Sequence, residues 1–163
     1  MRFPNQRGAA LIVALIFLLV LTLLGVGAMR STNLQERMAG NLRDSNLAFQ
    51  AAESALRDGE QLLRQATVPV FGGTGGLLQR QDAAGEASFW KTYDWAGNSM
   101  TAPAISGVAA APQYVIEELP PVPQTGGSVR FGALPEVSFY RVTARAVGGT
   151  TDAVSVLQIT YRR

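Results

Sequence analysis

A long apolar segment near the N-terminus constrains the fold of this chain more than any other feature. A leader containing Arg2 and Arg7 is followed by 21 residues, Ala9 to Met29, that carry no charge and a single hydroxyl, on Thr22. As a helix rising about 1.5 Å per residue, the segment would be about 31 Å long, the thickness of a bilayer's hydrocarbon core. Such a helix needs either lipid or other apolar helices around it.

Three interpretations of this segment stay open on composition alone. A cleaved signal peptide would use Val26-Gly27-Ala28 as its cleavage region, but a signal h-region spans about 7–15 residues and this segment is longer. An uncleaved anchor would keep its basic leader in the cytoplasm by the positive-inside rule. In the third interpretation the chain is cut directly after Gly8, because Gln6-Arg7-Gly8-Ala9 resembles the basic-Gly junction that prepilin peptidases recognise. Such a cut leaves the whole apolar helix at the new N-terminus.

The composition excludes several classes of function. The 163 residues include no cysteine and no histidine, which rules out thiolate catalysis, Cys/His zinc sites, a histidine general base and disulfides. The formal charge of +2 equals that of the two leader arginines, so the basic pI does not indicate binding to nucleic acid. The glycine-rich stretch from Phe71 to Gly76 lacks the lysine of a phosphate loop, and no calcium-loop spacing is present. We therefore expect no enzyme activity, no metal and no cofactor.

The helical pattern continues beyond the apolar segment. No proline lies between Pro4 and Pro69, so one helix from residue 9 to about 65 is allowed. Two Glu–Arg pairs four residues apart, beginning at Glu53 and Glu60, have the orientation that stabilises helices. Apolar residues recur every seven positions on one predicted face: Leu42, Phe49, Leu56 and Leu63. The stretch from Ala9 to Leu42 has no evident partner within the chain, so we expect it to pack among other helices.

The last third of the chain predicts an antiparallel sheet of three or four strands. Gln113–Leu119 is a candidate strand that ends in a polyproline-like connector, residues 120–123. Residues 138–147 and 153–162 alternate apolar and polar side chains, and the Gly-rich segment 148–152 between them is typical of a hairpin turn. We expect the apolar face of this sheet to pack on Phe49, Leu56 and Leu63.

A loop-rich region separates the helix from the sheet. Within it, Phe89 to Trp95 concentrates four of the chain's thirteen aromatic residues. The favoured interpretation is a short core element that caps the helix, and the alternative is an aromatic patch that faces a partner. The predicted organisation is therefore a leader (1–8), an apolar helix (9–29), its amphipathic continuation (30–65), a variable region (66–112) and a sheet with a C-terminal hairpin (113–163).

The stretch from Arg7 to Glu60 resembles the N-terminal region of PilX-type minor pilins of type IV pili. Its most specific parts are Leu34-Gln35-Glu36-Arg37-Met38-Ala39-Gly40-Asn41 and Ala48-Phe49-Gln50-Ala51-Ala52-Glu53. Segments of the C-terminal hairpin, including Tyr140-Arg141-Val142-Thr143-Ala144-Arg145, are also similar to these proteins. The resemblance implies an α+β, pilin-like fold, with one long helix packed on a small antiparallel sheet.

The resemblance also implies a function in pilus assembly. A chain of this kind would be cut by prepilin peptidase at Arg7-Gly8-Ala9 and N-methylated on Ala9. It would stay in the inner membrane with its C-terminal part in the periplasm, and then enter the pilus (fimbrium). The implied partners are other minor pilins, the major pilin, the inner-membrane assembly platform and, where one is carried, a tip adhesin. Twitching motility and cell adhesion would depend on it.

One departure from the general pilin pattern concerns Val13. Pilins usually carry glutamate at this fifth mature position, where a carboxylate costs roughly 2.5–3.5 kcal/mol in lipid and so needs a cationic partner. The resemblance to tip subunits that also lack this glutamate implies a position at or near the filament tip. We expect the helix surface at Val13, Leu34, Met38 and Leu42 to mediate assembly. Two alternatives remain: a type II secretion pseudopilin, and a single-span periplasmic binding module with an uncleaved anchor.

Overall fold

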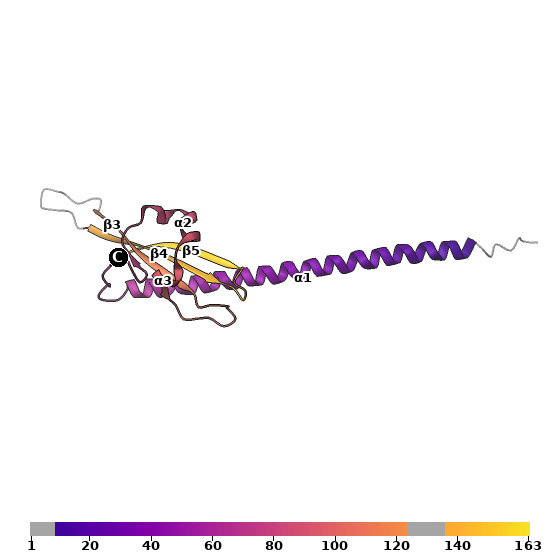
Figure 1. Cartoon of the computed structure of the whole chain (residues 1–163), viewed down its shortest axis with the longest axis horizontal. Helices are drawn as coiled ribbons and strands as arrows, with labels where there is room; N and C mark the ends of the chain where they lie inside the picture. The colour runs from indigo at the N-terminus through magenta and orange to yellow at the C-terminus, as the bar shows by residue number, and fades with distance from the viewer. Residues whose placement is uncertain (1–8, 124–135) are drawn as a thin grey trace, which may run out of the picture. The chain divides into compact units, whose positions relative to one another are not determined.

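The structure, a computed structural model, describes residues 9–123 and 136–163 (Figure 1). The leader, residues 1–8, lies outside the described residues. The chain divides at Leu42/Arg43 into two compact units, which are treated separately below. In chain order, the elements are α1 (Ala9–Leu63), β1 (Leu77–Leu78), the 3₁₀ helix η1 (Asp82–Gly85), α2 (Ala87–Thr92), α3 (Trp95–Asn98), β2 (Met100–Thr101), β3 (Gln113–Pro123), β4 (Glu136–Val147) and β5 (Val154–Arg162).

Helix α1 is continuous from Ala9 to Leu63, which confirms the predicted single helix. Both predicted ion pairs form, Arg57 with Glu53 at 2.5 Å and Arg64 with Glu60 at 3.2 Å. They are largely exposed, so each contributes only about 0.3–0.5 kcal/mol. The end of the helix is capped by the C-terminal residue, because the Arg163 guanidinium donates to the carbonyl oxygens of Leu63 at 3.0 Å and Ala66 at 3.1 Å. A cation here also suits the negative end of the helix dipole.

Within residues 9–123 and 136–163, the sheet is mixed and has five strands. Its main path is β1-β3-β4-β5, and β2 pairs with β3 off this path. The three long strands are antiparallel, as predicted, whereas the two-residue strand β1 runs parallel to β3. The predicted polyproline connector is wrong, because residues 120–123 form the last part of β3. The ladder between β3 and β4 shifts register between Leu119 and Val122, and this irregularity accommodates two prolines that lack N–H donors.

Alanines dominate the contact between α1 and the sheet. The buried hydrophobic residues of the helix are Ala48, Ala51, Ala52, Ala55, Leu56 and Leu63. The predicted contribution of Phe49 to this core is wrong, because its side chain is 48% exposed. Phe49 lies seven residues before Leu56, and so only about 20° of helix rotation from it, at the edge of the buried face, where its side chain stays half exposed. Close approach also requires Gly59, since a Cβ there would lie 2.6 Å from Val142 Cγ1.

The aromatic run forms a second core on the opposite face of the sheet. In β3, Tyr114 and Ile116 face α1, whereas Val115 between them packs with Trp90 and Trp95. The run is therefore a core element, but it covers the far face of the sheet rather than the helix (Figure 1). The Trp90 and Trp95 ring centroids are 5.5 Å apart. The sheet is thus covered on both faces in the unit that begins at Arg43.

Candidate functional site

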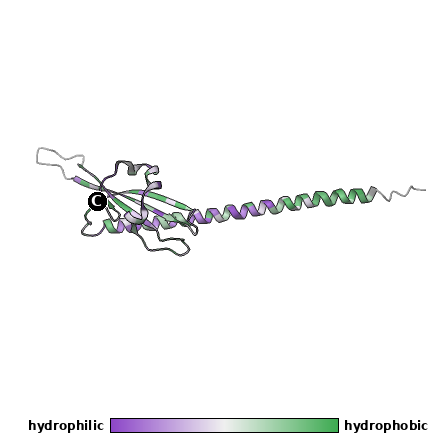
Figure 2. Ribbon diagram, in the orientation of Figure 1, coloured by the Kyte–Doolittle hydropathy of each residue, from purple (hydrophilic) through white to green (hydrophobic). Residues whose placement is uncertain are grey.

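The part of α1 that precedes Arg43 exposes large apolar side chains, from Leu11 to Leu42. It contains the one segment among the described residues that is long and apolar enough to span a membrane, judged by length and composition. Figure 2 shows the hydrophobic colour on the first turns of α1 and more hydrophilic residues in the stretch that follows. The predicted cleavage residues Arg7 and Gly8 lie outside the described residues, and Ala9 is the first residue of α1.

The predicted assembly residues lie on this exposed surface. Val13 belongs to the apolar segment. Leu34, Met38 and Leu42 lie beyond this segment and are four residues apart from one another. All four are exposed, and Leu42 is still 65% exposed. Residues four apart lie on one side of a helix, so the last three form an apolar row beyond the membrane-length segment. Burying one leucine is worth about 1.5–3 kcal/mol, so covering this row with an apolar surface would be favourable.

Asp44 fastens the β4–β5 turn to α1 within the second unit. Its carboxylate accepts hydrogen bonds from the backbone N–H of Gly149 at 2.5 Å and of Thr150 at 3.3 Å, and from the Thr150 hydroxyl. The Thr150 hydroxyl is the main cause that lowers the pKa of Asp44. Gly148 is required beside it, because a Cβ there would collide with the Asp44 carboxylate and carbonyl oxygens. The sequence predicted the turn but not its partner on the helix.

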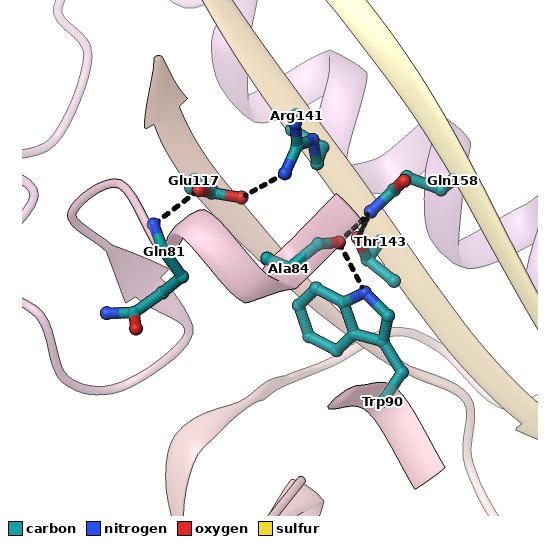
Figure 3. A network of polar contacts seen from close by, with 7 residues as sticks. All are labelled: Gln81, Ala84, Trp90, Glu117, Arg141, Thr143 and Gln158. Atoms are coloured by element: carbon teal, nitrogen blue, oxygen red, sulfur yellow. Dashed lines mark hydrogen bonds and ion pairs between the residues drawn. The ribbon is translucent and has the colours of Figure 1, made fainter. Parts of the chain in front are cut away.

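A buried polar network holds residues 81–90, which cover the face of the sheet opposite α1, against the strands (Figure 3). Glu117, 1% exposed, accepts from the backbone N–H of Gln81 at 2.6 Å and from the Arg141 guanidinium at 3.2 Å. Gln158 donates to the Thr143 hydroxyl at 2.9 Å and to the Ala84 carbonyl at 3.0 Å, which also accepts from the Trp90 indole at 2.8 Å. Both Glu117 oxygens are engaged, so this carboxylate has the environment of a structural group.

Sequence reasoning missed this network, although one signal for it was present. Arg141 and Thr143 lie on the polar face of the alternating strand β4, and Glu117 pairs with Arg141 across β3 and β4. A charged residue inside an otherwise apolar strand needs such a partner.

Between α1 and the sheet, burial and then the Asp58 carboxylate raise the pKa of Tyr114. The described part of the chain contains no group of three or more Asp, Glu, His or Cys side chains that could hold a metal ion.

The comparisons with known proteins agree with the geometry of the helix and the sheet. Residues 7–57 match the family model described as PilX N-terminal. Residues 44–163 match the model described as type IV pilus assembly protein PilX C-term. No curated protein and no solved structure matches the chain with statistical significance. The two family models together extend from the predicted cleavage junction to the C-terminus.

Proposed function

This chain belongs to the PilX family of type IV pilus assembly proteins, and we propose that it is a minor pilin that helps to prime assembly of the pilus. In this proposal it is cut after Gly8 by prepilin peptidase, methylated on Ala9 and held in the inner membrane. The unit from Arg43 onward stays in the periplasm and later lies on the pilus. The protein has a structural function and catalyses no reaction.

The exposed apolar surface of α1 is the observation that carries the proposal. Up to Met29 this surface suits lipid, but the row Leu34, Met38 and Leu42 lies beyond the membrane-length segment. A simple anchor needs no such row, whereas a helix that enters a filament does. Transfer from lipid into a bundle of apolar helices exchanges one set of apolar contacts for another at small hydrophobic cost.

The position in the filament that we propose is at or near the tip. Val13 provides no carboxylate for the N-terminal ammonium of a neighbouring subunit, so this chain lacks one of the contacts that a shaft subunit uses. Its partners would be other minor pilins, the major pilin, the assembly platform and, where one is carried, an adhesin. By this route the protein would support twitching motility and surface adhesion. A Val13→Glu variant that is distributed along the shaft no differently from the wild type would remove the support for a tip position.

The N-terminus of the membrane-extracted protein tests the proposal. Intact-mass and N-terminal analysis should find a chain that begins at methylated Ala9 and is recovered with sheared pili. A chain that begins at Met1 would favour an uncleaved anchor, and one that begins at Met29 would favour a signal peptide. A correctly processed chain that is absent from pili but required for type II secretion would identify a pseudopilin instead.

A further inference from the structure

Strand β5 forms an outer edge of the sheet, and its outer side lacks the protection that edge strands usually have. It runs from Val154 to Arg162 without proline or glycine, and its only charge is on its last residue. Its pairing with β4 is continuous in register. Proteins usually protect an edge of this length with proline, a bulge, internal charges or a covering element, because it offers unpaired backbone groups. Within the described residues, no strand pairs with the outer side of β5.

The direction of the unpaired backbone groups follows from the two ends of the hairpin. At one end the Gly148 N–H donates to the Ala153 carbonyl, and at the other the Arg163 N–H donates to the Ser138 carbonyl. Antiparallel pairs alternate between hydrogen-bonded and non-bonded positions, and the register here is continuous. The alternate residues therefore direct their N–H and C=O groups away from β4: Val154, Val156, Gln158, Thr160 and Arg162.

The core of the sheet is incomplete at the same edge. On the face toward α1, the β4 row of Tyr140, Val142 and Ala144 is buried. The neighbouring β5 row, which continues this face as Leu157, Ile159 and Tyr161, is only half-buried. A further strand beside β5 would cover this row and add apolar burial to both partners.

The other face of the edge is basic and lies beside a groove. Arg145 is the cross-strand partner of Val156, and Arg162 lies at the end of the same row of β5. An open groove of about 390 Å³ is lined by apolar side chains that include Leu119, Val122 and Phe139, together with Arg141 and Thr160. Because Thr160 belongs to both β5 and the groove lining, a strand added to β5 would place a side chain next to the groove. Strand addition with a pocket for alternate side chains is a common mode of peptide recognition.

We propose that β5 is the docking site for an extended segment of another pilus protein, which joins the sheet as an additional strand. Alternate residues of this segment would be apolar and would cover Leu157 and Ile159. An acidic side chain would lie opposite Arg162, since opposite charges stabilise cross-strand pairs. The proposal rests on the proposed function only in taking the partner from the pilus.

A second copy of the chain is a poorer occupant of this edge. Antiparallel pairing of β5 with β5 would relate the copies by a two-fold axis perpendicular to the sheet. Such a two-fold contact uses the same edge of both copies and closes on itself, so it adds no further subunit along a filament. The strand β5 itself contains no carboxylate, so a second β5 would not provide an acidic residue within the strand to pair with Arg162.

Photo-crosslinking in piliated cells tests the proposal. The photoreactive residue p-benzoylphenylalanine replaces Val154, and the crosslinked peptides are identified by mass spectrometry. The expected product joins Val154 to one extended segment of another pilus protein. The same photoreactive residue at Val70, which is 88% exposed and lies outside the sheet, is the control and should give no such product.

Two substitutions at Val156 then separate the backbone from the side chain. Val156→Ala keeps the outward N–H and should keep the crosslink, whereas Val156→Pro removes this donor and should lower the yield at least about tenfold. Protease resistance of the full-length protein in membranes reports whether the proline variant folds. If it does not fold, Val156→Lys replaces it, with Val70→Lys as its control. The lysine keeps the N–H but places a charge on the edge beside Arg145, which opposes strand addition and should also lower the yield.

The outcomes separate this inference from the proposed function. Equal yields with Val156→Ala and the disruptive variant, or no product at Val154 in a protein that is recovered with pili, would overturn the docking site alone. A product between two copies of the chain would overturn the choice of partner. A processed protein that never enters pili would overturn the proposed function first.

Discussion

The two parts of helix α1 differ in what they bury, although they form one element. Up to Leu42 the helix carries large apolar residues, and those of its membrane-length segment and of the row that follows are exposed. From Arg43 onward the buried face consists mainly of alanines, and the large residue Phe49 is half exposed. Small side chains allow the sheet to approach closely, whereas large side chains on an open surface need another molecule. The comparison teaches that residue size along one helix separates the surface that packs within the chain from the surface that we propose for assembly.

Leu63 and Leu42 give the largest expected difference between the two parts. Leu63 is fully buried, so Leu63→Ala should destabilise the folded unit by about 3 kcal/mol. Leu42→Ala should change the free energy of unfolding by less than about 0.5 kcal/mol but reduce incorporation into pili. Thermal unfolding of the full-length protein in detergent and recovery in sheared pili measure the two effects. Equal losses of stability in the two variants would contradict the distinction between the exposed part of α1 and the part that packs on the sheet.

Glu117 is the next strongest position, because its loss leaves partners without a hydrogen bond inside the second core. Glu117→Ala should cost about 2–4 kcal/mol, since the Gln81 N–H and the Arg141 guanidinium lose their acceptor. The adjacent exposed Glu118→Ala is the matched control and should lie within about 0.5 kcal/mol of the wild type. Chemical unfolding of both variants measures the difference. A Glu117→Ala variant with an unchanged free energy of unfolding would show that the network does not hold residues 81–90 on the sheet.

Two glycines of α1 should respond in opposite directions. Gly40→Ala meets no atom within 4 Å and should stabilise the helix by up to about 1 kcal/mol. Gly59→Ala gains the same helix propensity but forces Val142 and Tyr114 to move, so we expect a net loss of about 1 kcal/mol. The melting temperatures of the two variants in the same detergent decide this. A stabilised Gly59→Ala variant would mean that the contact between helix and sheet is loose.

The attachment of the hairpin turn by Asp44 should give the smallest effect, and one that depends on pH. Its hydrogen bonds lower the pKa in the folded state, so their stabilisation is fully present above the unfolded pKa of about 3.9 and is lost as the pH falls through the folded pKa. The difference in melting temperature between the wild type and Asp44→Asn should therefore be constant near neutral pH and shrink below about pH 4. A difference that grows with acidity would have the wrong sign.

The sequence predicted the elements better than their contacts. The extent of α1 and the antiparallel hairpin follow from local periodicity, which is visible in one stretch of chain. Phe49 shares the predicted face with Leu56 and Leu63 but lies at the edge of the contact, whose centre is a row of alanines that a pattern of large residues does not reveal. The continuation of β3 through residues 120–123 depends on a register shift against β4, and Asp44 meets Thr150 more than a hundred positions away. Contacts of this kind are set by tertiary packing, which a local pattern does not contain.

The most direct test of the central claim is the accessibility of position 42 before and after assembly. The chain has no cysteine, so Leu42→Cys provides a single thiol. A maleimide that does not cross membranes should label this thiol in the membrane-held pool of permeabilised cells and leave it unlabelled in intact sheared pili. Val70→Cys should be labelled in both pools, and Leu63→Cys in neither. Equal labelling of position 42 in the two pools would contradict the account, because the exposed surface of α1 would then have no partner in the pilus.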